Sequence, residues 1–198
     1  RRPAPDGAEL ADAAAMIRAA KAPVMICGGG VIYSGAEDAL DAFATRFNIP
    51  VVETQAGKSA LAQDHPMNFG AAGVDGSVAA NAALRAADLV VAVGTRLQDF
   101  TTGSRTLFPQ ARLLGINVAA HDAAKQGGVG LVADARVALQ ALSAELGDLR
   151  FEAADPQARA GWLAAVDAHC GRPADGLPTD AQVIGAVQAA APDGIAMC

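Results

Sequence analysis

The sequence predicts an α/β protein with a doubly wound, open parallel sheet of about six strands, Rossmann-like, with helices on both faces. The first observation is a pair of apolar runs without polar alternation, Pro23–Cys27 and Leu89–Val93. Such runs are typical of parallel strands, which are buried on both faces. The second is that segments of helical periodicity separate these runs. A strand, a helix and the next strand fit into about 30 residues, the length of a right-handed βαβ unit.

The predicted elements alternate along the chain. A capping residue precedes each helix, and apolar residues follow it at helical spacing. Asp6 with Glu9 and Ser34 with Glu37 have the spacing of capping boxes. Helices are expected to begin at Asp6, Ser34, Ser77, Asp134, Asp155 and Thr179, and strands are expected at 23–27, 49–53, 89–93, 112–118 and 129–132.

The domain organisation follows from one glycine- and proline-rich stretch. Residues 171–178, GRPADGLP, are the best linker candidate. We therefore expect a central Rossmann-like domain over residues 1–172, and a linker with the truncated start of another domain over residues 173–198. The chain starts at Arg1 without Met and stops at GIAMC, an apolar run that a strand would continue. We expect it to be a fragment of a longer polypeptide.

Composition excludes several classes of partner. The chain has 198 residues, of which 52% are hydrophobic and 18% charged, as in globular proteins. The net charge of −6 disfavours nucleic acid and anionic membranes, and no apolar run approaches the ~18 residues of a membrane helix. Cys27, Cys170 and Cys198 have unrelated spacings, so we expect no disulfides, no metal site and a reducing, cytoplasmic location.

The stretch PVMICGGGVIYSG, residues 23–35, joins a strand to three glycines and a helix. This arrangement is typical of phosphate-binding turns. The dinucleotide fingerprint G-x-G-x-x-G fails, however, because its third glycine would fall on Tyr33. Ser34 is expected to cap the following helix and to occupy the N–H groups that a pyrophosphate needs. Contact between these glycines and a nucleotide, and a simple tight turn, both remain open.

Two further motifs are interpreted as structural. Glu53 ends a strand where a Rossmann acid would hold a ribose, but with the fingerprint broken we interpret it as a strand-end polar residue. Gly57-Lys58-Ser59 imitates the end of a Walker A loop, yet the leading glycine of that motif is replaced by Val52. We expect Lys58 to be a surface or interface residue.

The stretch VGTRLQDFTTGS, residues 93–104, follows the most apolar strand. Open α/β sheets bind ligands at the carboxyl ends of their strands. Arg96 suits a diphosphate because its planar guanidinium donates two parallel hydrogen bonds. The alternative is that an ion pair between Arg96 and Asp99 only orders the loop. No catalytic residue is predicted, since nothing matches a nucleophile motif, and His65 is interpreted as a loop anchor.

Five stretches occur together in one order and resemble a known family. They are PVMICGGGVIYSGA, PVVETQAGKSAL, HPMNFGAAGVDGS, ADLVVAVGTRLQDFTTGS and INVAAHDAAK. Together they resemble the central domain of thiamine-diphosphate-dependent enzymes of the acetolactate synthase type, over roughly residues 8–198. Within that family, ETQAGKSAL and VGTRLQDFTTGS are most similar to the branch of trihydroxycyclohexane-1,2-dione hydrolases of inositol breakdown.

The resemblance implies a three-domain, homo-oligomeric enzyme (a dimer or tetramer) of which this chain is the middle part. The first domain would supply a catalytic glutamate, and the third would bind thiamine diphosphate and Mg²⁺ through a GDG motif; neither belongs to this sequence. The whole enzyme would open the ring of a cyclic dione, while this fragment alone would be inactive. The central domain would space the catalytic domains and, as in several relatives, could hold FAD or ADP.

The resemblance also transfers nucleotide contacts to particular positions. These are Gly28, Gly29, Thr54, Gln55, Gly73, Gly94, Thr95, Arg96 and Asn117. Relatives that bind FAD have acidic residues where this chain has Gln98 and Asn117, and a basic one where it has Phe100. FAD, ADP and an empty site are therefore alternatives. Three readings of the chain stand: the central domain of this or another thiamine enzyme, a free-standing NAD- or FAD-binding protein, and a structural module without ligand.

Overall fold

The computed structural model describes residues 2–152, 155–171 and 176–191. These fall into two compact units, Arg1–Ala154 and Asp155–Cys198. The predicted boundary near residue 172 thus lies later than the division between the units. The predicted linker 171–178 lies partly, and the predicted strand at GIAMC wholly, outside the described residues.

The first unit is a six-stranded sheet in the order β3-β2-β1-β4-β5-β6, and every neighbouring pair is parallel. This is the strand order of doubly wound dinucleotide-binding folds, so the predicted fold class is confirmed. The strands are β1 (Pro23–Cys27), β2 (Val51–Glu53), β3 (Asn68–Ala71), β4 (Leu89–Val93), β5 (Arg112–Asn117) and β6 (Val129–Val132). The edge strand β3 was not located from sequence, because NFGA is short and has no apolar run.

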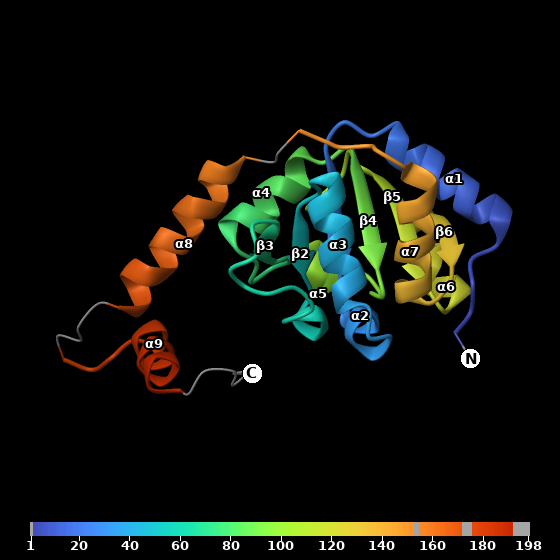
Figure 1. Cartoon of the computed structure of the whole chain (residues 1–198). Helices are drawn as coiled ribbons and strands as arrows, with labels where there is room; N and C mark the ends of the chain where they lie inside the picture. The colour runs from blue at the N-terminus through green and yellow to red at the C-terminus, as the bar shows by residue number, and fades with distance from the viewer. Residues whose placement is uncertain (1, 153–154, 172–175, 192–198) are drawn as a thin grey trace. The chain divides into compact units, whose positions relative to one another are not determined.

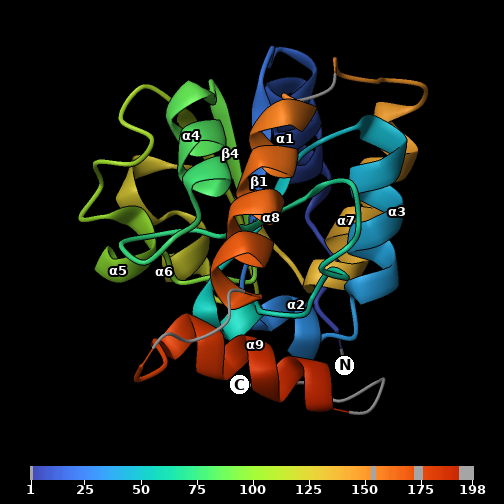
Figure 2. The same ribbon diagram turned by 90° about the vertical axis from the view of Figure 1, so that its left-hand side faces the viewer.

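Helices cover both faces of this sheet. The helices of the first unit are α1 (Gly7–Arg18), α2 (Gly29–Tyr33), α3 (Glu37–Phe47), α4 (Val78–Ala86), α5 (Asp99–Thr102), α6 (Ala120–Ala123) and α7 (Ala135–Leu146), with 3₁₀ turns η1 (Gln55–Gly57) and η2 (Lys125–Gly127). Helices α1, α3 and α7 pack together on one face, and α4 and α6 contact strands at β3 and β5–β6. Figure 1 and Figure 2 show α3 and α7 side by side.

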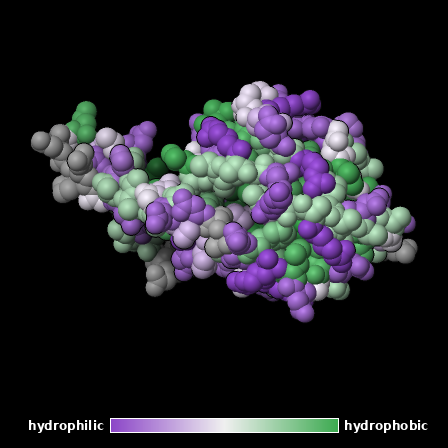
Figure 3. Space-filling model, turned by 90° about the horizontal axis from the view of Figure 1, so that it is seen from above, coloured by the Kyte–Doolittle hydropathy of each residue, from purple (hydrophilic) through white to green (hydrophobic). Residues whose placement is uncertain are grey.

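The largest apolar cluster lies between the sheet and the α1–α3–α7 layer. Alternate strand residues such as Met25, Val91 and Leu114 meet Phe43 and Phe47 of α3 there, and all are at most 1% exposed. Because the strands are buried on both faces, residues that point to the other side, such as Val24, Ile26 and Val90, are also apolar. On the face seen in Figure 3, hydrophilic side chains are spread among apolar ones.

The helix caps confirm all but one of the predicted starts, and both predicted capping boxes are corrected. Asp6, Ser77 and Asp134 each accept hydrogen bonds from the first turn of their helices. The Asp6–Glu9 capping box is only half formed, because the Glu9 carboxylate instead accepts from the Val132 N–H at 2.9 Å. Glu9 therefore ties α1 to the end of β6.

The Ser34–Glu37 capping box is wrong. The glycine stretch itself forms the short helix α2, with Gly28 as its N-cap and Ser34 as its C-cap, and the Ser34 hydroxyl donates to the Val31 carbonyl at 3.1 Å. Helix α3 then begins after Ala36 without a side-chain cap. Glycine has a low helix propensity, so two glycines at this position predict no helix from sequence. Tertiary contacts described below hold them in the helical conformation.

The second unit consists of α8 (Pro156–Cys170) and α9 (Asp180–Ala190), which contact each other. Both predicted starts are confirmed: Asp155 accepts from Gln157 N–H, and Thr179 forms a reciprocal capping box with Gln182. A Cβ at Gly185 would lie 2.5 Å from the Cys170 carbonyl oxygen, so the glycine lets α9 approach the end of α8.

Replacing Gly94 tests the close backbone approach between the segments that follow β1 and β4. Gly94 has φ +61°, and a Cβ there would lie 2.7 Å from Gly30 Cα. Gly94→Ala is expected to lower the free energy of unfolding by about 2–5 kcal/mol, from the left-handed conformation and from overpacking. Gly35→Ala is the matched control, since its φ is +57° and nothing lies within 4 Å. Urea denaturation giving equal costs for both variants would contradict the close approach.

Candidate functional site

A cavity of about 720 Å³ opens at the carboxyl edge of the sheet. The loop after β1 leads to helices on one face, whereas the segments after β4 and β5 lead to α5 and α6. This is the topological switch point, where open α/β sheets bind ligands. Residues from the loops that follow β1, β2, β3, β4 and β5 line the cavity. Its volume lies within the ~300–1,000 Å³ of small-molecule sites.

The structure brings most of the predicted contact residues together. Those that line the cavity are Gly29, Thr54, Gln55, Gly94, Thr95, Arg96 and Asn117. Gly28 and Gly73 do not line it. A Cβ on Gly28 would lie 2.5 Å from the Gly94 carbonyl oxygen, and one on Gly73 would lie 2.4 Å from that of Phe100. These two glycines therefore allow loops to pack closely beside the cavity.

The glycine turn after β1 has few free N–H groups for a phosphate. Gly30 N–H donates to the Gly94 carbonyl at 2.9 Å, and Val31 N–H donates to the Gly28 carbonyl at 3.0 Å. A Cβ on Gly30 would lie 2.6 Å from Gly94 Cα. The prediction that these donors are occupied holds, but backbone carbonyls occupy them and not the Ser34 hydroxyl. The turn serves backbone packing against the loop after β4.

Arg96 is the cationic side chain of the cavity lining. The predicted alternative, an ion pair with Asp99, is not among the salt bridges of the described residues. The guanidinium is exposed and has no hydrogen-bond partner within the part of the chain that the structure describes. It is therefore available to an anionic ligand, and its fork geometry suits a diphosphate.

Several predicted polar side chains are already bound to backbone. The Thr54 hydroxyl accepts from Gly57 N–H at 3.0 Å, and the Thr95 hydroxyl accepts from Leu97 N–H at 3.2 Å. The Asn117 amide donates to the Thr95 carbonyl and accepts from Ala119 N–H, each at 3.1 Å. These residues shape the loops of the cavity, and their capacity to bind a ligand directly is reduced.

Sequence reasoning missed two carboxylates and an aromatic residue of the lining. Asp75 and Asp122 line the cavity from the loop after β3 and from α6, and Tyr33, at the end of α2, is 91% exposed. Asp75 lies in HPMNFGAAGVDGS and Asp122 in INVAAHDAAK. Both stretches carry the family resemblance, but the resemblance gave neither acid a role in the site. Carboxylates bind ligand hydroxyls well, and aromatic rings stack on flat heterocycles.

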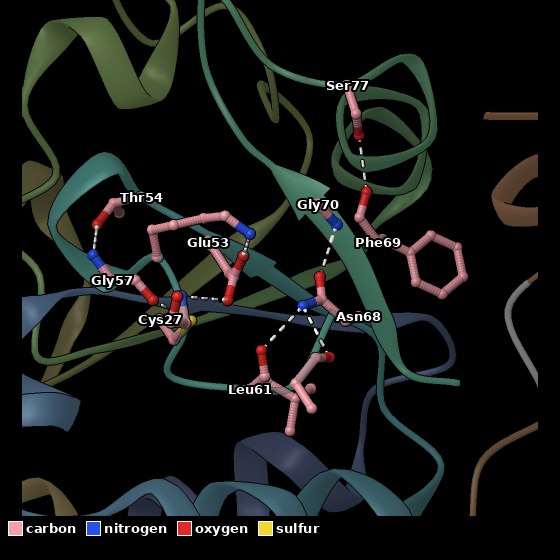
Figure 4. Close-up of polar contacts among 12 residues, drawn as sticks. Cys27, Glu53, Thr54, Gly57, Leu61, Asn68, Phe69, Gly70 and Ser77 are labelled. Carbon is pink, nitrogen blue, oxygen red and sulfur yellow. Dashed lines mark hydrogen bonds and ion pairs between the residues drawn. The ribbon is translucent and has the colours of Figure 1, made fainter. Parts of the chain in front are cut away.

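A second polar cluster lies beside the cavity, beneath the loop that follows β2 (Figure 4). The side chain of Glu53 is 1% exposed; one carboxylate oxygen accepts from Ser59 N–H at 3.1 Å, and the other lies 3.5 Å from Lys58 Nζ. That second oxygen has no hydrogen bond. The Walker-like stretch Gly57-Lys58-Ser59 therefore binds the buried carboxylate of Glu53. Glu53 itself does not line the cavity.

Cys27 belongs to the same cluster. Its thiol contacts the Gly57 carbonyl at 3.9 Å, and a Cβ on Gly57 would lie 2.2 Å from the Cys27 carbonyl oxygen. Burial, and next the negative charge of Glu53, raise the pKa of the Cys27 thiol well above its ordinary value of 9.0. The thiol therefore stays protonated in the folded protein.

His65 anchors the loop before β3, as expected. Its Nδ1 accepts from Met67 N–H at 3.0 Å and its Nε2 lies 3.1 Å from the Thr45 hydroxyl. Among the described residues, no group of three or more His, Cys, Asp or Glu side chains could hold a metal ion. A search of the same residues for a helix long and apolar enough to cross a membrane found none.

Comparison with known proteins identifies the family. Residues 10–142, which include all strands of the sheet and the whole cavity lining, match the family described as thiamine pyrophosphate enzyme, central domain. The chain belongs to this family. The resemblance seen in the sequence is thereby confirmed.

Two relatives at about 50% identity share one name. The chain is 50% identical over 137 residues to the 3D-(3,5/4)-trihydroxycyclohexane-1,2-dione hydrolase of Geobacillus thermodenitrificans, covering 69% of this chain and 21% of that protein. It is 49% identical over 150 residues to the protein of the same name from Bacillus cereus, covering 75% and 23%. The chain thus spans about a fifth of the length of these relatives.

Solved structures show the same fold. A candidate thiamin diphosphate-dependent enzyme from Mycobacterium smegmatis superposes with a TM-score of 0.62 at 32% identity, over 78% of this chain and 29% of that one. Benzoylformate decarboxylase from Polynucleobacter necessarius superposes with a TM-score of 0.60 at 25% identity, over 75% and 28%.

A double-mutant cycle tests the buried ion pair. Lys58→Met is expected to lower the free energy of unfolding by about 1–3 kcal/mol, because it leaves the Glu53 carboxylate buried without a countercharge. In a Glu53→Gln background, which retains an acceptor for Ser59 N–H, the same change is expected to cost much less. Chemical denaturation of the four proteins measures this coupling. Equal costs of Lys58→Met in both backgrounds would show that solvent screens the pair completely.

The buried thiol predicts a pH dependence of stability. Above pH 9.0 the Cys27 thiol loses its proton in the unfolded chain but keeps it in the folded one, where its pKa is raised. The contribution of the protonated thiol to the free energy of unfolding is therefore fully present below this pH. Above it, the free energy of unfolding falls by up to about 1.4 kcal/mol per pH unit. Denaturation between pH 8 and 10 should show a steeper fall for the wild type than for Cys27→Ala. Parallel curves for the two proteins would refute the assignment.

Proposed function

We propose that this chain is the central domain of a thiamine-diphosphate-dependent hydrolase that opens the ring of trihydroxycyclohexane-1,2-dione in inositol catabolism. The identity of 49–50% to hydrolases of that name supports this proposal. Because the chain spans about a fifth of those proteins, the ring-opening activity is proposed for a longer polypeptide that contains it. Thiamine diphosphate, when bound, supplies the electron sink for cleavage of a carbon–carbon bond next to a carbonyl.

The residues of the cavity do not fit thiamine diphosphate with Mg²⁺. Its two lining carboxylates, Asp75 and Asp122, belong to no group of three or more metal-ligand side chains among the described residues. We therefore assign thiamine diphosphate and Mg²⁺ to the flanking domains, in agreement with the resemblance. This domain then acts as the scaffold that spaces them, in a cytoplasmic homo-oligomer of two or four subunits.

The cavity does fit a nucleoside diphosphate. The observation that carries this part of the proposal is the Arg96 guanidinium, unpaired among the described residues, in a cavity of about 720 Å³ lined by Asp75 and Asp122. Arg96 would bind the diphosphate, the carboxylates would accept from ribose hydroxyls, and Phe100 and Tyr33 would lie against the base. ADP, or the ADP part of FAD, meets these requirements. The nucleotide would stabilise the central domain and take no part in the ring opening.

The ring-opening proposal is tested with two proteins. A longer polypeptide that includes the flanking domains is expected to convert the cyclic dione to a deoxy-glucuronic acid when thiamine diphosphate and Mg²⁺ are supplied, whereas the 198-residue chain is expected to be inactive. Product formation is followed by mass spectrometry. An inactive long form that retains its fold and binds thiamine diphosphate would reject this substrate, and a pyruvate condensation assay would then test the acetolactate synthase alternative.

The nucleotide proposal is tested by ligand-dependent stability. ADP at about 100 times its dissociation constant is expected to add about 2.7 kcal/mol to the free energy of unfolding of the 198-residue chain. Arg96→Ala is expected to weaken ADP binding roughly 10- to 150-fold, the loss of a charged hydrogen bond. Arg85→Ala, which removes an arginine of α4 outside the cavity lining, is the control. If Arg96→Ala and the wild type bind ADP with equal affinity, Arg96 does not contact the nucleotide.

A further inference from the structure

Three successive carbonyl groups of the loop after β4 accept hydrogen bonds from side chains at the end of β5 and after it. We call the three donors the carbonyl clasp. The pairs are Asn117 Nδ2 with the Thr95 carbonyl at 3.1 Å, Lys125 Nζ with the Arg96 carbonyl at 2.7 Å, and Gln126 Nε2 with the Leu97 carbonyl at 3.2 Å. Because the clasp binds three consecutive peptide groups, it sets the orientation of this loop as a unit.

The clasp determines where the N–H groups of the loop point. In a planar trans peptide the N–H lies opposite the carbonyl. Carbonyls that point to the clasp therefore direct the N–H groups of Arg96, Leu97 and Gln98 to the other side. The Leu97 N–H is used within the loop by the Thr95 hydroxyl. The N–H groups of Arg96 and Gln98 have no acceptor among the described residues, and both residues line the cavity.

Backbone strain shows that the loop needs such support. Leu97 has φ +45° and Gln126 has φ +60°, a region that L side chains rarely adopt. Strained residues persist where surrounding contacts over-determine them, and they concentrate at ligand sites. Here the hydrogen bond between Leu97 and Gln126 joins the two strained residues directly.

Lys125 and Gln126 act from outside the cavity. Neither lines it, while Arg96, whose carbonyl Lys125 holds, does. The turn after β1, where a pyrophosphate sits in standard dinucleotide-binding folds, has its Gly30 and Val31 N–H groups occupied by carbonyls. Of that turn, only the Gly29 N–H lines the cavity without an acceptor among the described residues, whereas the loop after β4 combines two such N–H groups with the cation of the lining.

We propose that the loop Thr95–Gln98 is the phosphate subsite of the cavity and that Lys125 and Gln126 are its positioning residues. The diphosphate of the ligand accepts from the Arg96 guanidinium and from the N–H groups of Arg96 and Gln98. This rests on the proposed nucleoside diphosphate site. It goes further, because it locates the phosphates on the loop after β4 and makes two residues outside the cavity determine affinity for them.

The test compares ADP with adenosine, which lacks the phosphates, by titration calorimetry on the 198-residue chain. Lys125→Met and Gln126→Leu are each expected to weaken ADP binding about 3- to 10-fold, the range of one hydrogen bond, and to leave adenosine binding unchanged. Lys125→Arg, which can still donate, should retain wild-type affinity for ADP. Lys21→Met removes an exposed lysine elsewhere and controls for net charge. Thermal midpoints confirm that each variant is folded.

The remaining outcomes overturn the proposal in distinguishable ways. Equal losses for ADP and adenosine would mean that the clasp only supports the fold. A loss of ADP affinity in Lys125→Met but not in Gln126→Leu would mean that the lysine charge acts directly and that the clasp does not. Unchanged ADP affinities in both variants would show that Lys125 and Gln126 do not position the loop for phosphate binding, while the nucleotide site itself would stand. A wild-type chain that binds neither ADP nor adenosine would overturn the nucleotide site together with the clasp.

Discussion

The backbones of the loops after β1 and β4 meet at Gly30 and Gly94, and the candidate site depends on this contact. The Gly30 N–H donates to the Gly94 carbonyl, and neither position has room for a Cβ. Because β1 and β4 are neighbours at the switch point, the contact lies where the two halves of the sheet meet. It also occupies donors that a standard dinucleotide turn would offer to phosphate. The anion-binding capacity of this edge therefore moves to the loop that carries Arg96.

The loops on either side are held mainly by polar side chains outside the cavity lining, with Asn117 as the exception. Glu53 holds the loop after β2 from below, through Ser59 N–H and the charge of Lys58. The clasp holds the loop after β4 from behind. Neither arrangement uses the Arg96 guanidinium, which stays unpaired among the described residues. The unpaired Arg96 guanidinium is suited to binding an anionic ligand that stabilises the domain.

Sequence reasoning located what local patterns determine. The apolar strands, the helix caps at Ser77 and Thr179 and the position of Arg96 at a strand end all follow from short stretches and were predicted correctly. What it missed depends on contacts distant in sequence. The start of α2 at Gly29 is decided by Gly94, and the role of Glu9 is decided by Val132. Asp75 and Asp122 reach the cavity from separate loops, and no spacing between them could have indicated this.

We propose that this domain holds a nucleoside diphosphate with its phosphates on the loop after β4, and a crystal structure of the 198-residue chain with ADP is the decisive test. We expect density for the diphosphate within hydrogen-bond distance of the Arg96 guanidinium and of the Gln98 N–H, with Lys125 and Gln126 still bound to the loop carbonyls. Density for the diphosphate at the Gly28–Gly30 turn, or an empty cavity at saturating ADP, would contradict it.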